Sequence, residues 1–378
     1  MLELTPTLFA ASTVQAIGIV IAVLAVLVVV VYAATNVRAG REEVGAELEL
    51  AANLKPYYDD DVLETKKLDR ALTAGLAGLV LVGVGLPAYW LAEPGRQEGA
   101  EKEFARIAVS RGEELYTAGA QCNACHGPDG VGGVAPHTIL DDDNEFVAQV
   151  NWLAPALDTA ALRYDEEELY YILEYGRPYS PMPAWGAGGG GPLTEQQLEN
   201  IIAYLQSITI SHEDSVGAVE TQLRTQLGLG EDAEIDYTDL ATGEALFNLG
   251  KEDAFAGGAY ACARCHTRGW SIQTASAAPA DADLDLYVDY EDGSGAYGPQ
   301  LRNGIIPRQF ASVEGLTEFL TLGAERGVPY GLNGLSGDGM MPGFGDNPNT
   351  EEDPEDGMLT LDMVTAIARY VESLEDGQ

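Results

Sequence analysis

The cysteines constrain this 378-residue chain more than any other feature, because all four lie in two copies of one pattern. Each copy reads Cys-x-x-Cys-His, and the residues are Cys122, Cys125 and His126 in the first copy and Cys262, Cys265 and His266 in the second. Two thiols one helical turn apart can reach the two vinyl groups of a haem, and the adjacent His supplies an iron ligand. A zinc site or a thioredoxin-like redox pair is the alternative, but both copies end in His and neither has a four-ligand pattern beside it. We therefore predict two covalently bound c-type haems.

Each haem iron needs a sixth ligand, which we expect on a loop downstream of each cysteine pair. Met182 is the only methionine between residues 96 and 208, and it lies between two prolines. The second copy offers Met340 and Met341, of which Met341 precedes a proline as Met182 does. A proline-rich loop can hold a thioether at iron, and Met-His ligation stabilises ferrous iron and raises the reduction potential. The predicted iron ligands are His126, Met182, His266 and Met341.

Two uncharged runs of 21 residues near the N-terminus are long enough to cross a membrane, Val14 to Ala34 and Ala71 to Leu91. At about 1.5 Å per residue, each run spans a hydrocarbon core of roughly 30 Å. Lys and Arg occur in the intervening loop, 36–70, and not before the first run, so the positive-inside rule places this loop in the cytoplasm. A cleaved signal peptide is the alternative for the first run, but no positive residue precedes it. We expect a multi-pass protein of the cell membrane with extracytoplasmic haem domains.

The charge of the chain is strongly unbalanced. It contains 60 Asp or Glu residues against 20 Lys or Arg, a formal net charge of −40, and the part after Pro94 alone carries −35. Nucleic acid is excluded as a partner because its phosphates would be repelled. The acidity favours a partner with a basic surface; the alternative is that it only maintains solubility.

The two haem motifs belong to an internal repeat. Segments 111–116 and 242–247 lead to the cysteine pairs with the same helical apolar spacing, and segments 193–207 and 359–373 each begin with Leu-Thr and continue as an amphipathic helix with Thr as N-cap. The predicted organisation is a transmembrane hairpin over 1–95, a haem domain over 96–208, a linker over 209–237 and a second haem domain over 238–378.

The second copy is longer than the first. Gly112 precedes Cys122 by 10 residues, whereas Gly243 precedes Cys262 by 19, so we expect an insertion around 251–260. We interpret the acidic segment 271–290 as a further loop, and the polar linker as a connection with room for one short helix.

Both halves resemble class I cytochrome c domains, over about 105–208 and 239–374. The resemblance rests on the opening helix, the Cys-x-x-Cys-His unit, the Met-Pro loop, the closing helix and, in the second half, the segment Gly298-Pro299-Gln300-Leu301. In the first half Val134-Ala135-Pro136 is the only counterpart that we find for this segment. The resemblance implies an all-α fold with one haem in each domain.

The layout of two spans followed by two haem domains is similar to the dihaem subunit of cbb-type haem-copper oxidases and to dihaem cytochromes c of actinobacterial-type respiratory chains. It implies electron transfer from a quinol-oxidising bc-type complex or a small redox carrier to a terminal oxidase, with no bond chemistry by the protein itself. One alternative is an integral dihaem subunit of a haem-copper oxidase or bc complex. The other is a dihaem cytochrome c peroxidase, which needs an exchangeable ligand site and which two Met-Pro loops disfavour.

Overall fold

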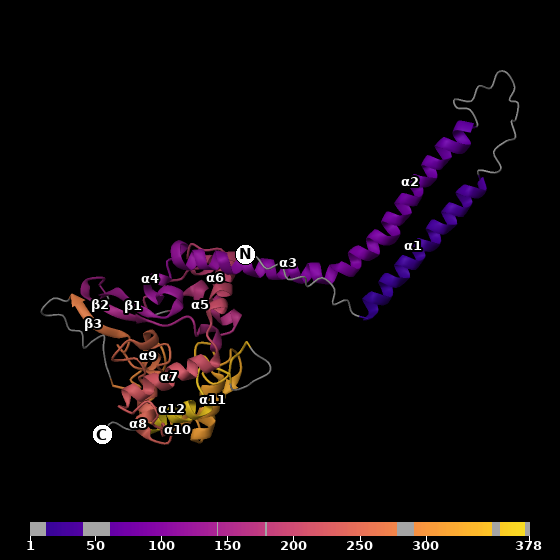
Figure 1. The fold of residues 1–378 in the computed structure, drawn as a ribbon. Coiled ribbons are helices and arrows are strands. Elements are labelled where there is room, and N and C mark those ends of the chain that lie inside the picture. The colour runs from indigo at the N-terminus through magenta and orange to yellow at the C-terminus, as the bar shows by residue number, and fades with distance from the viewer. Residues whose placement is uncertain are drawn as a thin grey trace. The chain divides into compact units, whose positions relative to one another are not determined.

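The computed structural model describes residues 13–40, 61–141, 143–177, 180–277, 291–349 and 356–374 (Figure 1). The chain divides into two compact units, an N-terminal unit of Met1–Phe104 and a C-terminal unit of Ala105–Gln378. Most of the described residues are helical, as the sequence predicts.

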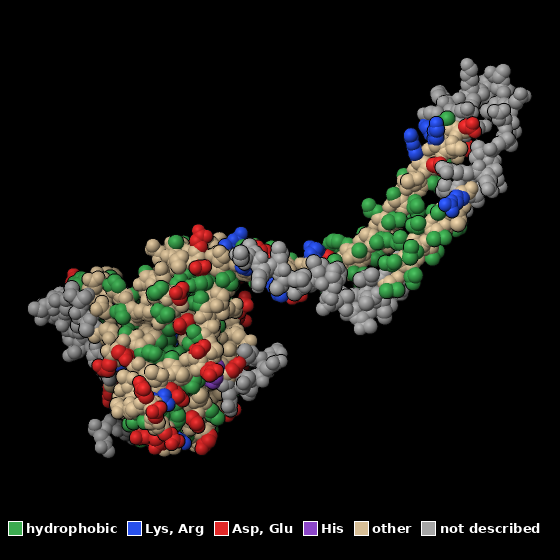
Figure 2. All heavy atoms as spheres, viewed as in Figure 1, with side chains coloured by type: hydrophobic (Ala, Val, Ile, Leu, Met, Phe, Trp, Pro, Cys, Tyr) green, Lys and Arg blue, Asp and Glu red, His purple; other side chains and the backbone are tan. Residues whose placement is uncertain are grey.

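The N-terminal unit consists of apolar helices. Its elements are α1 (Thr13–Gly40), the π-helical segment η1 (Val62–Lys67), α2 (Leu68–Val80), the π-helical segment η2 (Leu81–Gly85) and the first part of α3 (Leu86–Glu114). Helix α1 packs against η2, and Val23, Leu27, Val80 and Val84 line the apolar space between them. Hydrophobic side chains cover the outer face of these helices in Figure 2.

By length and composition, one helix in the described part of the chain could cross a membrane, the continuous helix Val62–Gly119 that contains the second predicted span. The apolar stretch described in α1, Val23–Thr35, is shorter. Residues 41–60 of the predicted loop 36–70 lie outside the described residues, and both ends of this loop are helical rather than irregular. The helix extends into the loop because no glycine or proline interrupts residues 62–70.

The C-terminal unit begins with the first repeat, 105–208. After the end of α3 its elements are η3 (Leu115–Gly119), α4 (Asn123–His126), η4 (Pro128–Gly130), β1 (Gly133–Leu140), β2 (Phe146–Ala154), η5 (Ala160–Leu162), α5 (Glu166–Tyr175), η6 (Ala187–Gly189) and α6 (Glu195–Ile208). Helix α6 begins at the predicted cap, because the Thr194 N–H and the Thr194 hydroxyl both donate to the side-chain oxygen of Gln197 at 3.0 Å.

The second repeat, 238–374, has a similar order of helices. Its elements are α8 (Leu240–Phe247), η7 (Phe255–Gly258), α9 (Ala263–His266), β3 (Ile272–Ala277), α10 (Ile305–Gln309), α11 (Val313–Leu322), β4 (Pro329–Tyr330), β5 (Leu335–Ser336) and α12 (Leu361–Ser373). Helix α12 is capped by Thr360, whose hydroxyl accepts from the Met363 N–H at 3.3 Å. Both predicted closing helices are thereby confirmed.

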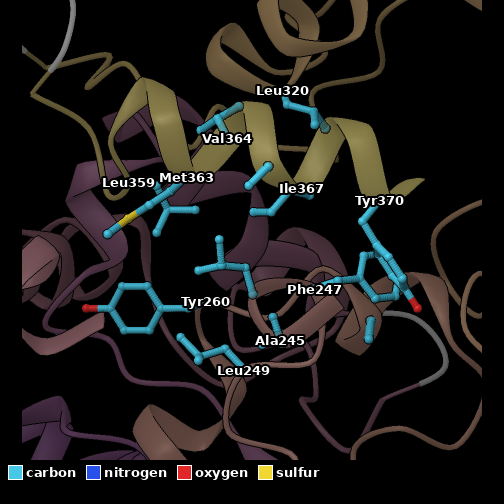
Figure 3. Close-up of a cluster of buried hydrophobic side chains, with 14 of the residues drawn as sticks. Ala245, Phe247, Leu249, Tyr260, Leu320, Leu359, Met363, Val364, Ile367 and Tyr370 are labelled. Carbon is cyan, nitrogen blue, oxygen red and sulfur yellow. The ribbon is translucent and has the colours of Figure 1, made fainter. Parts of the chain in front are cut away.

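Each closing helix crosses its opening helix at a glycine. A Cβ on Gly112 would lie 1.9 Å from the Asn200 carbonyl oxygen, and a Cβ on Gly243 would lie 2.3 Å from the Ala366 carbonyl oxygen. One turn later an aromatic side chain packs on the tyrosine of the closing helix in both repeats, at centroid distances of 5.2 and 5.4 Å; the pairs are Tyr116–Tyr204 and Phe247–Tyr370. Figure 3 shows the second pair at the edge of the buried cluster of the second repeat. The matched crossings give the two halves the same helical frame.

A three-stranded antiparallel sheet corrects the all-α prediction. Its order is β1-β2-β3, so strand β3 of the second repeat pairs with β2 of the first. The acidic loop predicted over 271–290 therefore begins with a strand, while 278–290 lie outside the described residues. Val150 and Ile272 are buried together at this junction. Sequence reasoning missed the strand because its partner belongs to the other repeat and is distant in the chain.

The segment predicted as a linker is partly a component of the second core. It contains α7 (His212–Gln226), so it holds a 15-residue helix where we expected a short one. Val219 and Leu223 are fully buried in the hydrophobic cluster of the second repeat, and the Ser215 hydroxyl donates to the Met358 carbonyl at 2.9 Å. Three apolar side chains of the first repeat, Leu153, Ala156 and Leu162, belong to the same cluster. The repeats consequently share one compact unit.

Candidate haem-attachment site

The first Cys-x-x-Cys-His segment forms the short helix α4. Cys122 is its N-cap, and the His126 N–H donates to the Cys122 carbonyl at 2.8 Å. This single helical turn puts the Cys122 and Cys125 side chains one turn apart, as attachment to two vinyl groups requires. Cys125 is exposed, whereas Cys122 is partly buried.

The second segment forms helix α9 in the same way. Cys262 is its N-cap, and the His266 N–H donates to the Cys262 carbonyl at 3.1 Å. Its surroundings are more enclosed, since Ala263 and His266 are buried and both cysteines are partly covered. The two Cys-x-x-Cys-His segments have the same backbone form and different exposure.

Both histidines are oriented by a proline carbonyl. His126 Nδ1 lies 2.8 Å from the Pro155 oxygen, and His266 Nδ1 lies 2.9 Å from the Pro299 oxygen. A carbonyl can only accept a hydrogen bond, so Nδ1 carries the proton and the lone pair of Nε2 remains available for iron. A hydrogen bond of this kind fixes the ring and makes the imidazole a better ligand.

Pro155 is a candidate functional residue that sequence reasoning missed. The proposed counterpart Val134-Ala135-Pro136 is wrong, because these residues lie in strand β1 and bond to β2. The segment 154–157, Ala-Pro-Ala-Leu, takes the role of Gly298-Pro299-Gln300-Leu301 instead. The Pro-x-Leu pattern common to both segments could have identified it, although Ala replaces the leading Gly.

Burial favours the neutral forms of the side chains at the two segments. Desolvation by the surrounding protein lowers the pKa of His126 to about 4 and also lowers the pKa of His266. Burial raises the pKa of the Cys122 thiol to about 11 and that of Cys262 to about 12. At neutral pH both imidazoles are therefore unprotonated at Nε2, which is the form that binds a metal.

The two methionine loops correspond closely in backbone geometry. Helices α5 and α11 each end at a glycine with positive φ, Gly176 at 71° and Gly323 at 80°. A Cβ on Gly176 would lie 2.7 Å from the Met182 carbonyl oxygen, and a Cβ on Gly323 would lie 2.8 Å from the Met341 carbonyl oxygen. The close approach at these glycines makes Met341, rather than Met340, the structural counterpart of Met182.

Each predicted methionine borders the same core as the cysteine of its own repeat. Met182 and Cys122 are partly buried against the core of the first repeat, and Met341 and Cys262 against that of the second. Met340 is 36% exposed and lies beside Arg177 of the other repeat. This arrangement supports the choice of Met341 as the second sulfur ligand.

The donor set fits a c-type haem in both repeats. Each contains two thiols one helical turn apart, an imidazole with a free Nε2 and a methionine at the edge of the same core. Bound haem would be held through the two cysteines, with the His and Met side chains available to bind its iron.

Comparison with protein families agrees with this geometry. Residues 108–205 match the model of the family described as cytochrome c oxidase, cbb3-type, subunit III. These residues form a cytochrome c domain. The cytochrome c domain implies a covalently bound c-type haem and a role in electron transfer. Comparison with curated proteins and with solved structures gave no match.

Proposed function

We propose that the protein is a membrane-anchored dihaem c-type cytochrome that transfers electrons in a respiratory chain. The observation that carries the proposal is the repeated histidine geometry, in which a proline carbonyl orients His126 in the matched cytochrome c domain and His266 outside it. Because the second segment reproduces the contacts of the first, it has the features needed to hold a second haem.

The predicted ligand sets favour an electron carrier over a catalyst. With His126 and Met182 on one iron and His266 and Met341 on the other, both irons would have all their ligand positions filled and would offer none to a substrate. The protein then supplies fixation, ligand choice and electrostatics, while the haem supplies the redox chemistry. A dihaem peroxidase would need one of these methionines to be displaced.

The proposed partners are a quinol-oxidising bc-type complex or a small redox carrier as donor and a terminal oxidase as acceptor. Acidic side chains are spread over the visible face of the C-terminal unit in Figure 2, in agreement with its excess of Asp and Glu. Such a surface attracts a partner with a basic docking face. We place the C-terminal unit outside the cytoplasm and the helices of the N-terminal unit in the cell membrane, which would keep the carrier near membrane-bound partners.

Haem counting on purified full-length protein tests the proposal. The wild type should carry two covalent haems by intact mass and by pyridine haemochrome absorbance. The double variant Cys122→Ser and Cys125→Ser should carry one, and so should the variant Cys262→Ser and Cys265→Ser. A single haem in the wild type would reject the dihaem assignment.

The family match favours a second candidate function, an integral subunit of a haem-copper oxidase, because the matched family is described as an oxidase subunit. Purification in mild detergent separates the two candidates. Stoichiometric co-purification with oxidase subunits would support the second, whereas isolation of the chain alone with a rapidly exchanging partner would support the free carrier.

A further inference from the structure

The two methionine loops meet at the junction between the repeats, and Arg177 lies between them. Its backbone belongs to the first loop, because the Arg177 N–H donates to the Met182 carbonyl at 3.2 Å. Its own carbonyl accepts from the Ser180 hydroxyl at 2.9 Å, and that hydroxyl accepts in turn from the Met182 N–H at 3.3 Å. Arg177 is thus a structural element of the loop that carries the first predicted sulfur ligand.

The side chain of Arg177 reaches the second loop. One guanidinium nitrogen, Nη1, lies 3.9 Å from the Met340 sulfur, and the other, Nη2, donates to the Tyr164 hydroxyl at 2.9 Å. The guanidinium carbon stands 5.5 Å from the centre of the Tyr164 ring. With the two nitrogens held at different repeats, the side chain has little freedom to point elsewhere.

Backbone hydrogen bonds to Ala324, just after α11, hold the second loop within its own repeat. The Met341 carbonyl accepts from the Ala324 N–H at 2.9 Å, and the Gly339 N–H donates to the Ala324 carbonyl at 2.8 Å. Asn349, a little further along the chain, donates to the Tyr164 carbonyl at 3.0 Å. Tyr164, which accepts a hydrogen bond from Arg177, therefore also accepts one from the second repeat. A displacement of Arg177 would consequently disturb the contacts of both loops.

Arg177 is one of only 14 Lys or Arg residues after Pro94, against 49 Asp or Glu. Among the charged groups, Glu168 and Arg163 interact electrostatically with Arg177, and Arg326 interacts with the same Glu168. Arg326 lies over the ring of Tyr171 at 4.7 Å. A fixed cation beside both loops would stabilise the ferrous form of an iron bound in either repeat relative to its ferric form.

We propose that Arg177 is a positioning residue shared by both iron sites, which holds the Met182 loop through its backbone and the Met340–Met341 loop through its guanidinium. It couples the two haems by setting sulfur ligation and reduction potential in both repeats at once. This inference rests on the proposed function, since it takes Met182 and Met341 as ligands.

Spectroelectrochemical titration of the full-length dihaem protein tests the proposal. In Arg177→Ala the midpoint potentials of both haems should fall, because a nearby cation is lost and both methionine loops loosen. The pH at which the sulfur-to-iron absorption disappears should also fall for both haems. Arg177→Lys keeps the charge but cannot contact the Met340 sulfur and the Tyr164 hydroxyl with two separate nitrogens in the same geometry. The potentials should therefore lie between those of the wild type and Arg177→Ala.

Two further variants isolate the cause. Arg224→Ala removes one cation from α7, where Arg224 pairs with Glu220 at 3.2 Å, and it should leave both potentials at their wild-type values. Met340→Ala removes the sulfur that Arg177 contacts, while Arg177 itself and the predicted ligands stay unchanged. It should lower the potential of the second haem alone. Combined with Arg177→Ala, it should have no further effect on the second haem, because both changes break one interaction.

The outcomes distinguish this inference from the proposed function. Absence of the sulfur-to-iron absorption in the wild type, or fewer than two haems, would reject the proposed function. A wild type with two Met-ligated haems, combined with an Arg177→Ala variant in which no potential or only one potential moves, would reject the coupling while the proposed function stands. Unchanged potentials in Met340→Ala would show that Arg177 does not act on the second loop through the Met340 sulfur.

Discussion

Replacing Gly243 by Ala tests the helix crossing on which the second repeat is built. The added Cβ would lie 2.3 Å from the Ala366 carbonyl oxygen and 2.8 Å from the Tyr370 Cβ. The first of these atoms belongs to the backbone of α12, so helices α8 and α12 must separate to admit the methyl group. Overpacking of this kind typically destabilises a protein by about 1–3 kcal/mol, and a clash with a helix backbone belongs at the upper end of that range.

The same substitution at Gly217 is a matched control with the opposite expected sign. Gly217 lies in α7 with nothing within 4 Å of an added Cβ, so Ala should stabilise the helix by roughly 0.5–1 kcal/mol. The two variants should therefore differ in unfolding free energy by about 3 kcal/mol.

Guanidinium unfolding of the detergent-solubilised protein, followed by helical circular dichroism and by haem absorbance, measures this difference. The transition of Gly243→Ala should move to lower denaturant concentration, and that of Gly217→Ala should stay or move slightly higher. Equal midpoints for the two variants would show that α8 and α12 do not approach as closely as described.

Three other predictions concern ligation, pH and docking. Met341→Ala should lose the sulfur-to-iron absorption of the second haem while Met340→Ala keeps it, and the reverse result would exchange the ligand assignment. Burial raises the pKa of Asp158 from 3.8 to about 6, so its stabilising protonated form is fully present below about pH 4 and lost as the pH rises through 6. With solvent screening of this partly exposed group taken into account, Asp158→Asn should accordingly be more stable than the wild type by roughly 1–2 kcal/mol at pH 8 and equally stable at pH 4 in urea titrations, and a constant difference would refute the burial effect. Electron transfer to a basic acceptor should slow as salt rises, because the Debye length is about 8 Å near 0.15 M; a salt-independent second-order rate would leave solubility as the role of the acidic surface.

Local chemistry explains why much of the candidate site could be predicted. The spacing within Cys-x-x-Cys-His is a property of one helical turn, so α4 and α9 follow from five consecutive residues each. The Thr caps of α6 and α12 are equally local, because a side-chain oxygen satisfies an N–H three residues away in the same chain segment. Sequence patterns of this kind identify a residue's partners without knowledge of the fold.

Contacts between distant segments explain what the sequence did not reveal. Strand β3 forms because its backbone finds β2 more than 100 residues earlier, and the role of Pro155 depends on a carbonyl brought to His126 from 29 residues away. Arg177 has no local pattern that marks it, since its sulfur contact lies 163 residues further along the chain. Helical periodicity and capping report only near neighbours. The helices of the two Cys-x-x-Cys-His segments were therefore determined by the sequence itself, whereas the joining of the two repeats into one unit was decided by tertiary packing.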